Sequence, residues 1–376
     1  GRYDDVDGSP VELKKMEDGA FEFTRPDNTI ERFEQGLLAG RTLPDGTKLT
    51  ILRGSNGLIS RVENDFGRYL DFDYNNDLQL QEISYNGEAI SYTYDEDYNL
   101  STVTYQDGAS LQYHYEKFAY PNHLTGYTDE NGVRFATWDY DEKGRAISSE
   151  HANGVEKVTL EYLPDQTIVT DALGAIRTYR LANEGSKFSV SNVSGDRCQD
   201  CKIKNGKDRQ YDAFGNLSQL TDWEGNVTKY TYSEGLEIAR TEAFGSPQER
   251  TITTEWHGDL LKPQKISGPI RVTEYTYNTV GLPLTVSISA PGDQASPDKK
   301  RTFTYSYTAD NLIQSIDGPR TDVSDVVYFD YDETGYLTSV TNALGHVKHY
   351  ADYNVFGLPE TLTDANGQVT ELQYNV

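Results

Sequence analysis

The chain has 376 residues, including 28 tyrosines and 32 glycines, and its 60 acidic and 34 basic side chains give a net charge of −26. This charge disfavours nucleic acids and anionic lipids as partners, because the sequence offers no basic surface that would displace counterions from phosphates. The sequence contains no run of about 18 apolar residues, so it predicts no membrane-spanning helix. Its two cysteines are too few for a disulfide-stabilised scaffold.

Residues 1–73 consist of short strand-like runs separated by turn signals. Asp-Gly and Asn-Gly pairs, which favour tight hairpin turns, occur at residues 7–8, 18–19, 45–46 and 56–57. Apolar and polar residues alternate between them, so that Phe21 and Phe23 fall on one face of a strand. No stretch has a sustained helical period. We predict a β-rich segment over residues 1–73 that leads into a repeat array over residues 74–376.

From Tyr74 onward one unit recurs with a base period of about 21 residues, as between Tyr211 and Tyr232 or between Tyr353 and Tyr374. Clear copies are YDAFGNLSQLTDWEGNVTKYTY (211–232), YDETGYLTSVTNALGHVKHY (331–350) and YNVFGLPETLTDANGQVTELQY (353–374). One hairpin cannot bury its own face, so the units must stack side by side. We predict an all-β fold, in which repetitive antiparallel hairpins form one continuous sheet that curves or spirals as strand twist accumulates.

The turn inside each unit follows from its residue types. Asp332 can accept a hydrogen bond from the backbone two residues later, and Gly335 can adopt the positive φ of a type I turn followed by a bulge. Tyr331 and Leu337 then bracket the turn and pack on one side of it. The turn and packing residues predicted in this way are Tyr211, Asp212, Gly215, Leu217, Tyr232, Tyr331, Asp332, Gly335, Leu337, Tyr353 and Gly357.

Two breaks in the period predict loop insertions near residues 184–209 and 289–300. The first insertion contains Cys198 and Cys201, separated by two residues. This pair supplies half of the ligands of a structural zinc site, and neither a second CxxC pair nor a spaced histidine pair lies nearby in the sequence. A local disulfide or two free thiols is therefore the simpler interpretation.

Other residue patterns do not indicate an active site. His346 and His349 are three apart on a predicted strand and face opposite sides, which argues against joint metal binding. The sequence has no phosphate-binding glycine loop before a helix and no GxSxG motif. We expect no catalytic residue, no cofactor-binding residue and no metal ligand in this chain. The carboxylates serve mainly in turns, although sequence alone leaves open a pair spaced for glycoside hydrolysis.

The three repeat copies resemble the YD (Rhs) repeats of bacterial rearrangement-hotspot proteins. Residues 126–132 (GYTDENG), 138–141 (WDYD) and 317–322 (DGPRTD) are also similar to sequences of that family. The resemblance extends from about residue 50 to residue 376. Members of the family form a long β-sheet that spirals into a hollow shell. In polymorphic toxins this shell encloses a C-terminal toxin and is exported, often by type VI secretion.

The resemblance implies a non-catalytic structural role. We expect a shell segment of an exported Rhs-type toxin or bacterial cell-surface protein, secreted or held at the cell surface. Its partners would be its own C-terminal toxin or cargo domain and the remaining shell repeats. Gly1 is not a start residue, and the family's self-cleaving segment follows the repeats, so we expect this chain to be a piece of a longer protein.

The alternative is a cell-surface adhesion or carbohydrate-binding module, with glycans or a neighbouring cell as partner. For that function Trp138, Trp223 and Trp256 are the candidates for stacking on sugar rings. The same side chains can equally pack between neighbouring repeat units. An enzyme with paired carboxylates in a cleft is a third interpretation.

Overall fold

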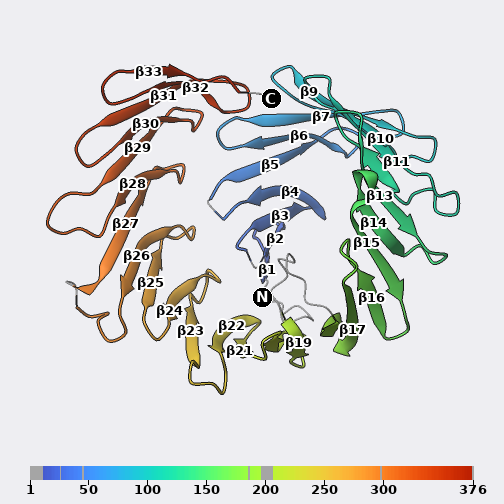
Figure 1. Ribbon diagram of the computed structural model, residues 1–376. Coiled ribbons are helices and arrows are strands. Elements are labelled where there is room, and N and C mark those ends of the chain that lie inside the picture. Colours follow the sequence, from blue (N-terminus) through green and yellow to red (C-terminus); the bar gives the residue numbers. More distant parts are fainter. Residues whose placement is uncertain are drawn as a thin grey trace. The chain divides into compact units, whose positions relative to one another are not determined.

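The computed structural model describes residues 12–25, 27–44, 46–184, 187–195, 206–296 and 299–374. These residues form 33 β-strands, with short 3-10 turns such as Ala152–Gly154 and no α-helix in the described part of the chain (Figure 1). The strands are assigned to one sheet. The predicted all-β antiparallel fold class is confirmed.

The chain divides into two compact units. Unit 1 comprises Gly1–Leu70 and Tyr230–Val376, and unit 2 comprises Asp71–Lys229. The sequence predicted a different boundary, at residue 73, where the repeat array begins. That boundary stays a prediction.

Unit 1 contains two ladders of antiparallel strands, and each strand pairs with the next one along the chain. The N-terminal ladder consists of β1 (Glu12–Lys15), β2 (Phe21–Thr24), β3 (Ile30–Glu34), β4 (Leu37–Thr42), β5 (Lys48–Arg53) and β6 (Ile59–Asn64). The C-terminal ladder consists of β22 (Leu236–Glu242), β23 (Arg250–Trp256), β24 (Pro263–Ser267), β25 (Val272–Tyr277), β26 (Pro283–Ser289), β27 (Arg301–Tyr307), β28 (Ile313–Asp317), β29 (Val327–Tyr331), β30 (Leu337–Thr341), β31 (Val347–Tyr353), β32 (Pro359–Thr363) and β33 (Val369–Glu371).

Unit 2 is one ladder with the same sequential antiparallel pairing. Its strands are β7 (Tyr69–Tyr74), β8 (Leu80–Tyr85), β9 (Glu88–Tyr94), β10 (Leu100–Thr104), β11 (Ser110–His114), β12 (Gly126–Thr128), β13 (Arg134–Tyr140), β14 (Ala146–His151), β15 (Val155–Tyr162), β16 (Gln166–Thr170), β17 (Ile176–Glu184), β18 (Lys187–Gly195), β19 (Gly206–Tyr211), β20 (Leu217–Asp222) and β21 (Val227–Ser233). β7 and β21 run across the division between the units.

Turns alternate between the two edges of each ladder, because consecutive strands run antiparallel. We call a turn after an odd-numbered strand an odd turn, and a turn after an even-numbered strand an even turn. Within one ladder all odd turns lie on one edge and all even turns on the other. Tyrosines end many odd strands, including β9, β25, β27, β29 and β31, so the odd turns are the ones that follow the repeat tyrosines.

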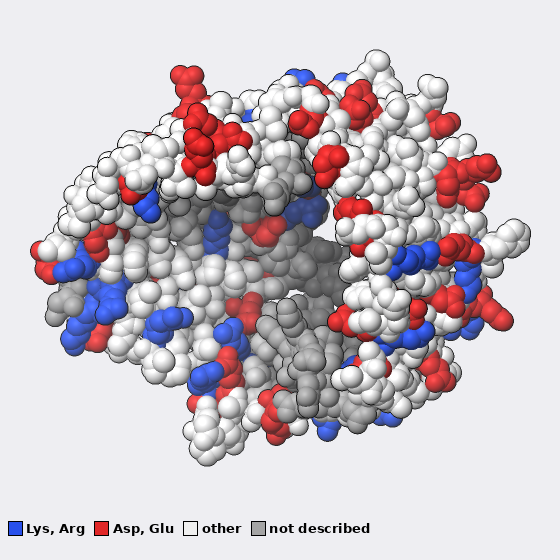
Figure 2. All heavy atoms as spheres, turned by 45° about the horizontal axis from the view of Figure 1, so that its top comes forward, with Lys and Arg blue, Asp and Glu red and all other residues white. Residues whose placement is uncertain are grey.

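The sheet is held together without a deep core. Within the described residues no large side chain is fully buried, and the buried apolar residues are small or medium-sized, such as Ala136, Val193 and Val272. Exposed and half-buried residues alternate along β5. Figure 2 shows acidic and basic side chains interspersed with neutral ones over the face it presents. Stability therefore comes mainly from pairing and side-chain contacts between neighbouring strands.

The two predicted insertions differ in structure. In the segment 184–209 the described residues belong to the end of β17, to β18 and to the start of β19, so this segment includes strand structure. Residues 185–186 and 196–205 lie outside the described residues. In the segment 289–300 a turn-containing connection joins β26 to β27.

Candidate functional site

The repeat turn after β29 is built around Asp332 and Gly335. The Asp332 carboxylate accepts the backbone N–H of Thr334 and of Tyr336, each at 2.9 Å. Gly335 has φ +77°, and its N–H donates to the Asp332 carbonyl at 3.1 Å. Burial would raise the pKa of Asp332, but hydrogen bonds from Thr334 and Tyr336 and the nearby Arg68 charge outweigh it and lower the pKa. The charged carboxylate therefore stabilises the turn.

The other predicted turn residues occupy matching positions. Asp212 accepts the N–H of Phe214 and of Asn216 at 2.9 Å, and Gly215 and Gly357 have φ of +82° and +76°. Register shifts beside these turns mark the bulges. Tyr211 pairs with Leu217 across one turn, and Tyr331 pairs with Leu337 across another. Tyr353 pairs with Pro359 in the same way. Tyr232 lies within β21.

The tyrosine hydroxyls join neighbouring strands, which the sequence reasoning missed. The hydroxyl of Tyr353, the last residue of β31, donates to the carbonyl of Leu337, the first residue of β30, at 2.6 Å. We call this contact a tyrosine latch. The same contact occurs at Tyr94 to Leu80, Tyr162 to Ala146, Tyr277 to Pro263 and Tyr307 to Pro283, at 2.6–2.8 Å. The signal in the sequence is the fixed place of tyrosine before each odd turn.

Burial favours the neutral form of the latch tyrosines Tyr277, Tyr307 and Tyr353. Burial, with a smaller contribution from Tyr275, raises the pKa of Tyr277 to about 12. Burial also raises the pKa of Tyr307 and Tyr353. A phenol that donates to a carbonyl is favoured over a phenolate there, because the charged form would lose both hydration and the donated proton.

Within unit 1 the even turn after β6 contacts the odd turn after β29. The Arg68 guanidinium donates to the Thr334 carbonyl at 2.7 Å and lies 4.1 Å from the centre of the Tyr336 ring. Tyr336 in turn stacks on Tyr353, with ring centres 4.4 Å apart and planes 7° apart. Arg68 and Thr334 are 266 residues apart in sequence, so this contact ties distant repeats together.

Glycines make room for both turn-to-turn contacts. A Cβ on Gly335 would lie 2.9 Å from a ring carbon of Phe66, and a Cβ on Gly46 would lie 2.7 Å from the Asn311 amide nitrogen. Gly46 belongs to the even turn after β4, and Asn311 to the odd turn after β27. Two successive even turns of the N-terminal ladder thus meet two successive odd turns of the C-terminal ladder. We call these contacts the seam; its residues are Gly46, Phe66, Arg68, Asn311, Gly335 and Tyr336.

Sequence reasoning singled out Gly335 for its φ but missed its partner Phe66. The turn of Phe66, Asn-Asp-Phe-Gly, carries a large apolar residue at its tip, where a solvated turn would favour a polar one. This phenylalanine at the turn tip was the sequence feature that could have indicated a contact. The feature does not show which distant turn the Phe66 ring contacts.

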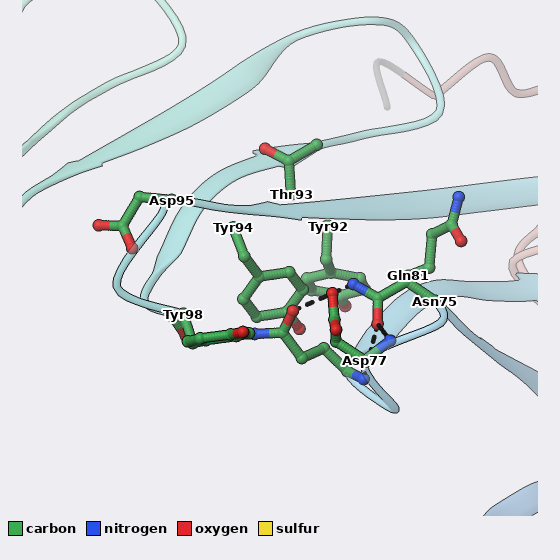
Figure 3. Close-up of a pocket in the computed structure, with 9 residues that line it drawn as sticks. Asn75, Asp77, Gln81, Tyr92, Thr93, Tyr94, Asp95 and Tyr98 are labelled. Atoms are coloured by element: carbon green, nitrogen blue, oxygen red, sulfur yellow. Dashed lines mark hydrogen bonds between the residues drawn. The ribbon is translucent and has the colours of Figure 1, made fainter.

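A pocket of about 310 Å³ lies in unit 2 beside the odd turns after β7 and β9 (Figure 3). Its aromatic lining comes from Tyr92, Tyr94 and Tyr98. Tyr98 has φ +64° and is 65 % exposed, so a tyrosine occupies the left-handed position that glycine holds in other repeat turns. The polar lining residues are Asn75, Asp77, Gln79, Gln81, Thr93 and Asp95.

None of the three tryptophans lines this pocket. The Trp138 ring stacks against Tyr127 with centres 6.1 Å apart, and the Trp256 indole N–H donates to the Glu237 carbonyl at 2.9 Å. Both rings thus contact neighbouring parts of the ladder. Trp223 lies in the even turn after β20 and is partly buried. Their role in sugar stacking stays a prediction.

Cys198 and Cys201 lie outside the described residues. In the described part of the chain no group of three or more His, Cys, Asp or Glu side chains is arranged to hold a metal ion. His346 lies beside Asn342, with 3.4 Å between the amide and ring nitrogens. Among the residues searched, no helix has the length and apolar character needed to cross a membrane.

Comparison with known proteins places these turns in a family of repeats. The family model of the RHS repeat matches residues 331–370. The chain is 23 % identical over 297 residues to the probable deoxyribonuclease RhsB of Dickeya dadantii, covering 72 % of this chain and 19 % of that protein. It is 26 % identical over 191 residues to the toxin protein Tse5 of Pseudomonas aeruginosa, covering 44 % of this chain and 14 % of that protein. The chain thus spans a fifth or less of these relatives.

Solved structures share the fold. The TcdB2-TccC3 structure without its hypervariable C-terminal region aligns with 94 % of this chain and 22 % of its own, at a TM-score of 0.55 and 12 % identity. The TcdB2-TccC3-Cdc42 structure aligns over the same shares at a TM-score of 0.53 and 12 % identity. The repeat match, the relatives and the shared fold agree with the turn chemistry described above, and residues 331–370 of the chain carry an RHS repeat.

Proposed function

We propose that this chain is a non-catalytic shell segment of a toxin-type RHS protein, which encloses a cargo carried by the same polypeptide. The observation that carries the proposal is the seam. A ladder whose turns dock on turns 266 residues away forms a wall in which distant repeats are joined edge to edge. Such a wall needs no thick core, in keeping with the absence of large fully buried side chains among the described residues.

The comparisons support the toxin assignment. Two curated relatives are named as a probable deoxyribonuclease and a toxin. Each of these proteins is at least five times as long as the part of it that this chain matches. In this proposal the reactive chemistry resides in the cargo, while residues 1–73 and 74–376 serve as wall. The protein would be exported or displayed at a bacterial surface, and its partners would be the cargo and the remaining repeats.

Limited proteolysis of the polypeptide that naturally carries this chain tests the proposal. We expect a cargo segment to resist protease while the wall is intact and to become cleavable when Phe66→Asp opens the seam. A matched control, Val369→Asp, changes a residue of β33 that is 52 % exposed and should leave the protection unchanged. Equal cleavage of the cargo in the native protein and the Phe66 variant would overturn the proposal.

Saccharide binding at the pocket of Figure 3 is a second candidate, favoured by its side chains. Three tyrosines beside amide and carboxylate groups suit a ligand with apolar ring faces and many hydroxyls. A glycan array is the test: Tyr98→Ala should abolish a hit that the native chain gives. Leu78→Ala is the matched control, because Leu78 has φ +62°, is 58 % exposed and lies outside the lining. An array without hits above background would reject this candidate.

A further inference from the structure

We propose that the pocket of Figure 3 binds an organic ammonium group, held by the rings of Tyr92, Tyr94 and Tyr98 beside the Asp77 carboxylate. This site goes beyond the proposed shell function and does not depend on it. The charge of the ligand follows from the side chains that line the pocket and from the contacts that those side chains already make.

Three tyrosine rings form the apolar part of the pocket. Tyr92 and Tyr94 are two residues apart on β9, so they project from the same face of that strand. Figure 3 shows their rings beside Tyr98, which lies in the odd turn after β9. The face of a tyrosine ring carries partial negative charge and attracts a cation within about 6 Å of the ring centre. Three such rings around one space favour a positively charged ligand over a neutral one.

The rings are held in place without a ligand. The Tyr94 hydroxyl donates to the Leu80 carbonyl at 2.8 Å, so this ring belongs to a tyrosine latch. Burial raises the pKa of Tyr92 and of Tyr94, which keeps both rings neutral at physiological pH. The Tyr98 carbonyl accepts the Gln79 side-chain amide at 3.2 Å, which ties its turn to the preceding odd turn. A site arranged in advance loses little conformational freedom on binding.

The amide side chains of the pocket are engaged with their own surroundings. The Asn75 amide donates to the Gln79 side-chain oxygen at 3.0 Å, and the Gln79 amide donates to Tyr98, as the dashed lines in Figure 3 show. The Asn75 oxygen accepts the backbone N–H of Asp77 at 3.0 Å and of Gln79 at 2.9 Å. The amides thus hold the two turns together, and the specificity of the pocket falls to its rings and its charge.

Asp77 supplies that charge. Its side chain is exposed, and its carboxylate has no hydrogen bond or ion pair within the described residues. The second carboxylate, that of Asp95, already accepts the N–H groups of Asp97 and Asn99 at 2.9 and 2.8 Å. Neither lysine nor arginine occurs among the described residues that line the pocket. An anionic ligand would therefore meet only like charge, whereas a cation would be attracted.

The size of the pocket limits the ligand to a small molecule. Its volume of about 310 Å³ lies near the lower end of the range of about 300–1,000 Å³ found for ligand pockets. Two sources provide the same chemistry at this size. One is a quaternary ammonium head group, as in choline, and the other is the protonated amine of an amino sugar. The amino sugar would also satisfy the saccharide candidate.

Isothermal titration calorimetry on the naturally occurring polypeptide tests the site. Choline should bind about ten times as tightly as the uncharged alcohol in which a tert-butyl group replaces its trimethylammonium group, because the two differ in charge and not in shape. Glucosamine and glucose form a second pair, and a similar preference for glucosamine would place the ammonium group on a sugar. Equal binding within both pairs, or no binding of either ammonium compound, would overturn the inference.

Three variants locate the binding. Tyr98→Leu keeps an apolar side chain without a ring and should weaken choline binding about five- to ten-fold, whereas Tyr98→Phe keeps the ring and should retain it. Asp77→Asn should weaken binding about two- to five-fold and reduce its dependence on salt. Leu78→Ala is the matched control and should bind as the native chain does. Equal choline binding by the native chain and Tyr98→Leu would overturn the assignment.

The failure of this site is distinguishable from the failure of the other proposals. If glucose and glucosamine bind equally well and both need Tyr98, the saccharide candidate stands and the ammonium assignment is wrong. The protection of a cargo from protease is measured at the seam, so the shell proposal stands or falls separately.

Discussion

The odd turn after β29 and the odd turn after β9 share one backbone design, and the difference that matters most is the residue at the left-handed position. Asp332 accepts two backbone N–H groups at 2.9 Å, and Asp95 accepts those of Asp97 and Asn99 at 2.9 and 2.8 Å. The left-handed position holds Gly335 in one turn and Tyr98 in the other. The first turn is covered by Phe66, whereas the second projects an exposed tyrosine beside a pocket.

This difference shows that the residue at the left-handed position decides what can approach the turn. Glycine leaves space for a second turn to approach, so the turn becomes a docking point. Tyrosine closes that approach and pays about 1–2 kcal/mol of backbone strain for the left-handed conformation. Strain retained at an exposed aromatic residue is a reason to look for binding at that turn.

Alkaline pH should have the largest effect on the ladders, because it titrates the tyrosine latches that join neighbouring strands. Tyr277 has a folded-state pKa of about 12, above the usual value of 10. Its stabilising contribution is therefore complete below pH 10 and is lost as the pH rises through 12. We expect circular dichroism to record unfolding across this range. Tyr277→Phe should cost about 1 kcal/mol at neutral pH and reduce the alkaline loss; an unchanged alkaline profile would contradict this role.

Gly335→Ala should be the most damaging single change at the docked turn. The new methyl group would be strained at φ +77° and would meet the Phe66 ring at 2.9 Å. We expect a loss of about 2–5 kcal/mol, the sum of left-handed strain and overpacking. Gly367→Ala is the matched control, because Gly367 has φ +81° with nothing within 4 Å. It should lose only about 1–2 kcal/mol. Urea denaturation measures both, and equal losses would remove Phe66 from the explanation.

Arg68→Ala should have the next largest effect. It removes the hydrogen bond to the Thr334 carbonyl and the contact with the Tyr336 ring. Together these contribute about 1–3 kcal/mol. Arg68→Lys should recover only part of the loss, because an ammonium group lacks the planar guanidinium that both bonds the carbonyl and stacks on the ring. Thermal unfolding measures the series, and full recovery by lysine would show that charge alone matters.

Tyr98→Gly should have the smallest effect on stability, and of opposite sign. Glycine accepts φ +64° without strain, so we expect the chain to become more stable by about 1 kcal/mol. The same change removes the exposed ring from the pocket. Thermal unfolding is the measurement, with Tyr98→Ala as control, since alanine keeps the strain. A destabilised glycine variant would mean that the Tyr98 side chain makes contacts worth more than its strain.

Much of the local structure follows from residue type. Asp332 and Gly335 specify their turn because a carboxylate two residues before a backbone N–H and a residue able to adopt positive φ are sufficient for it. The all-β class follows likewise from alternation and from turns at a regular spacing. The insertion near residues 184–209 was placed by a break in spacing alone, and spacing does not distinguish a loop from the added strand β18.

The candidate site was predictable in part. Tyr353 was recognised as a repeat residue, but the acceptor of its hydroxyl depends on the register between β30 and β31. The pocket escaped prediction because Tyr98 interrupts the glycine pattern instead of repeating it. Trp138, Trp223 and Trp256 attracted attention as rare aromatic residues, although rarity carries no information about which neighbours a ring contacts.

The repeat, its turns and the antiparallel hairpin follow from local sequence, because they depend on residues within about 21 positions of one another. The seam depends on the folded arrangement of the whole ladder. Phe66 and Gly335 meet because many hairpins in succession bring an even turn of one ladder against an odd turn of another, and that geometry accumulates from every intervening strand. The sequence shows an apolar residue at one turn and a glycine at another turn, 266 residues apart in the Arg68–Thr334 contact. Only the folded structure shows that these two turns contact each other.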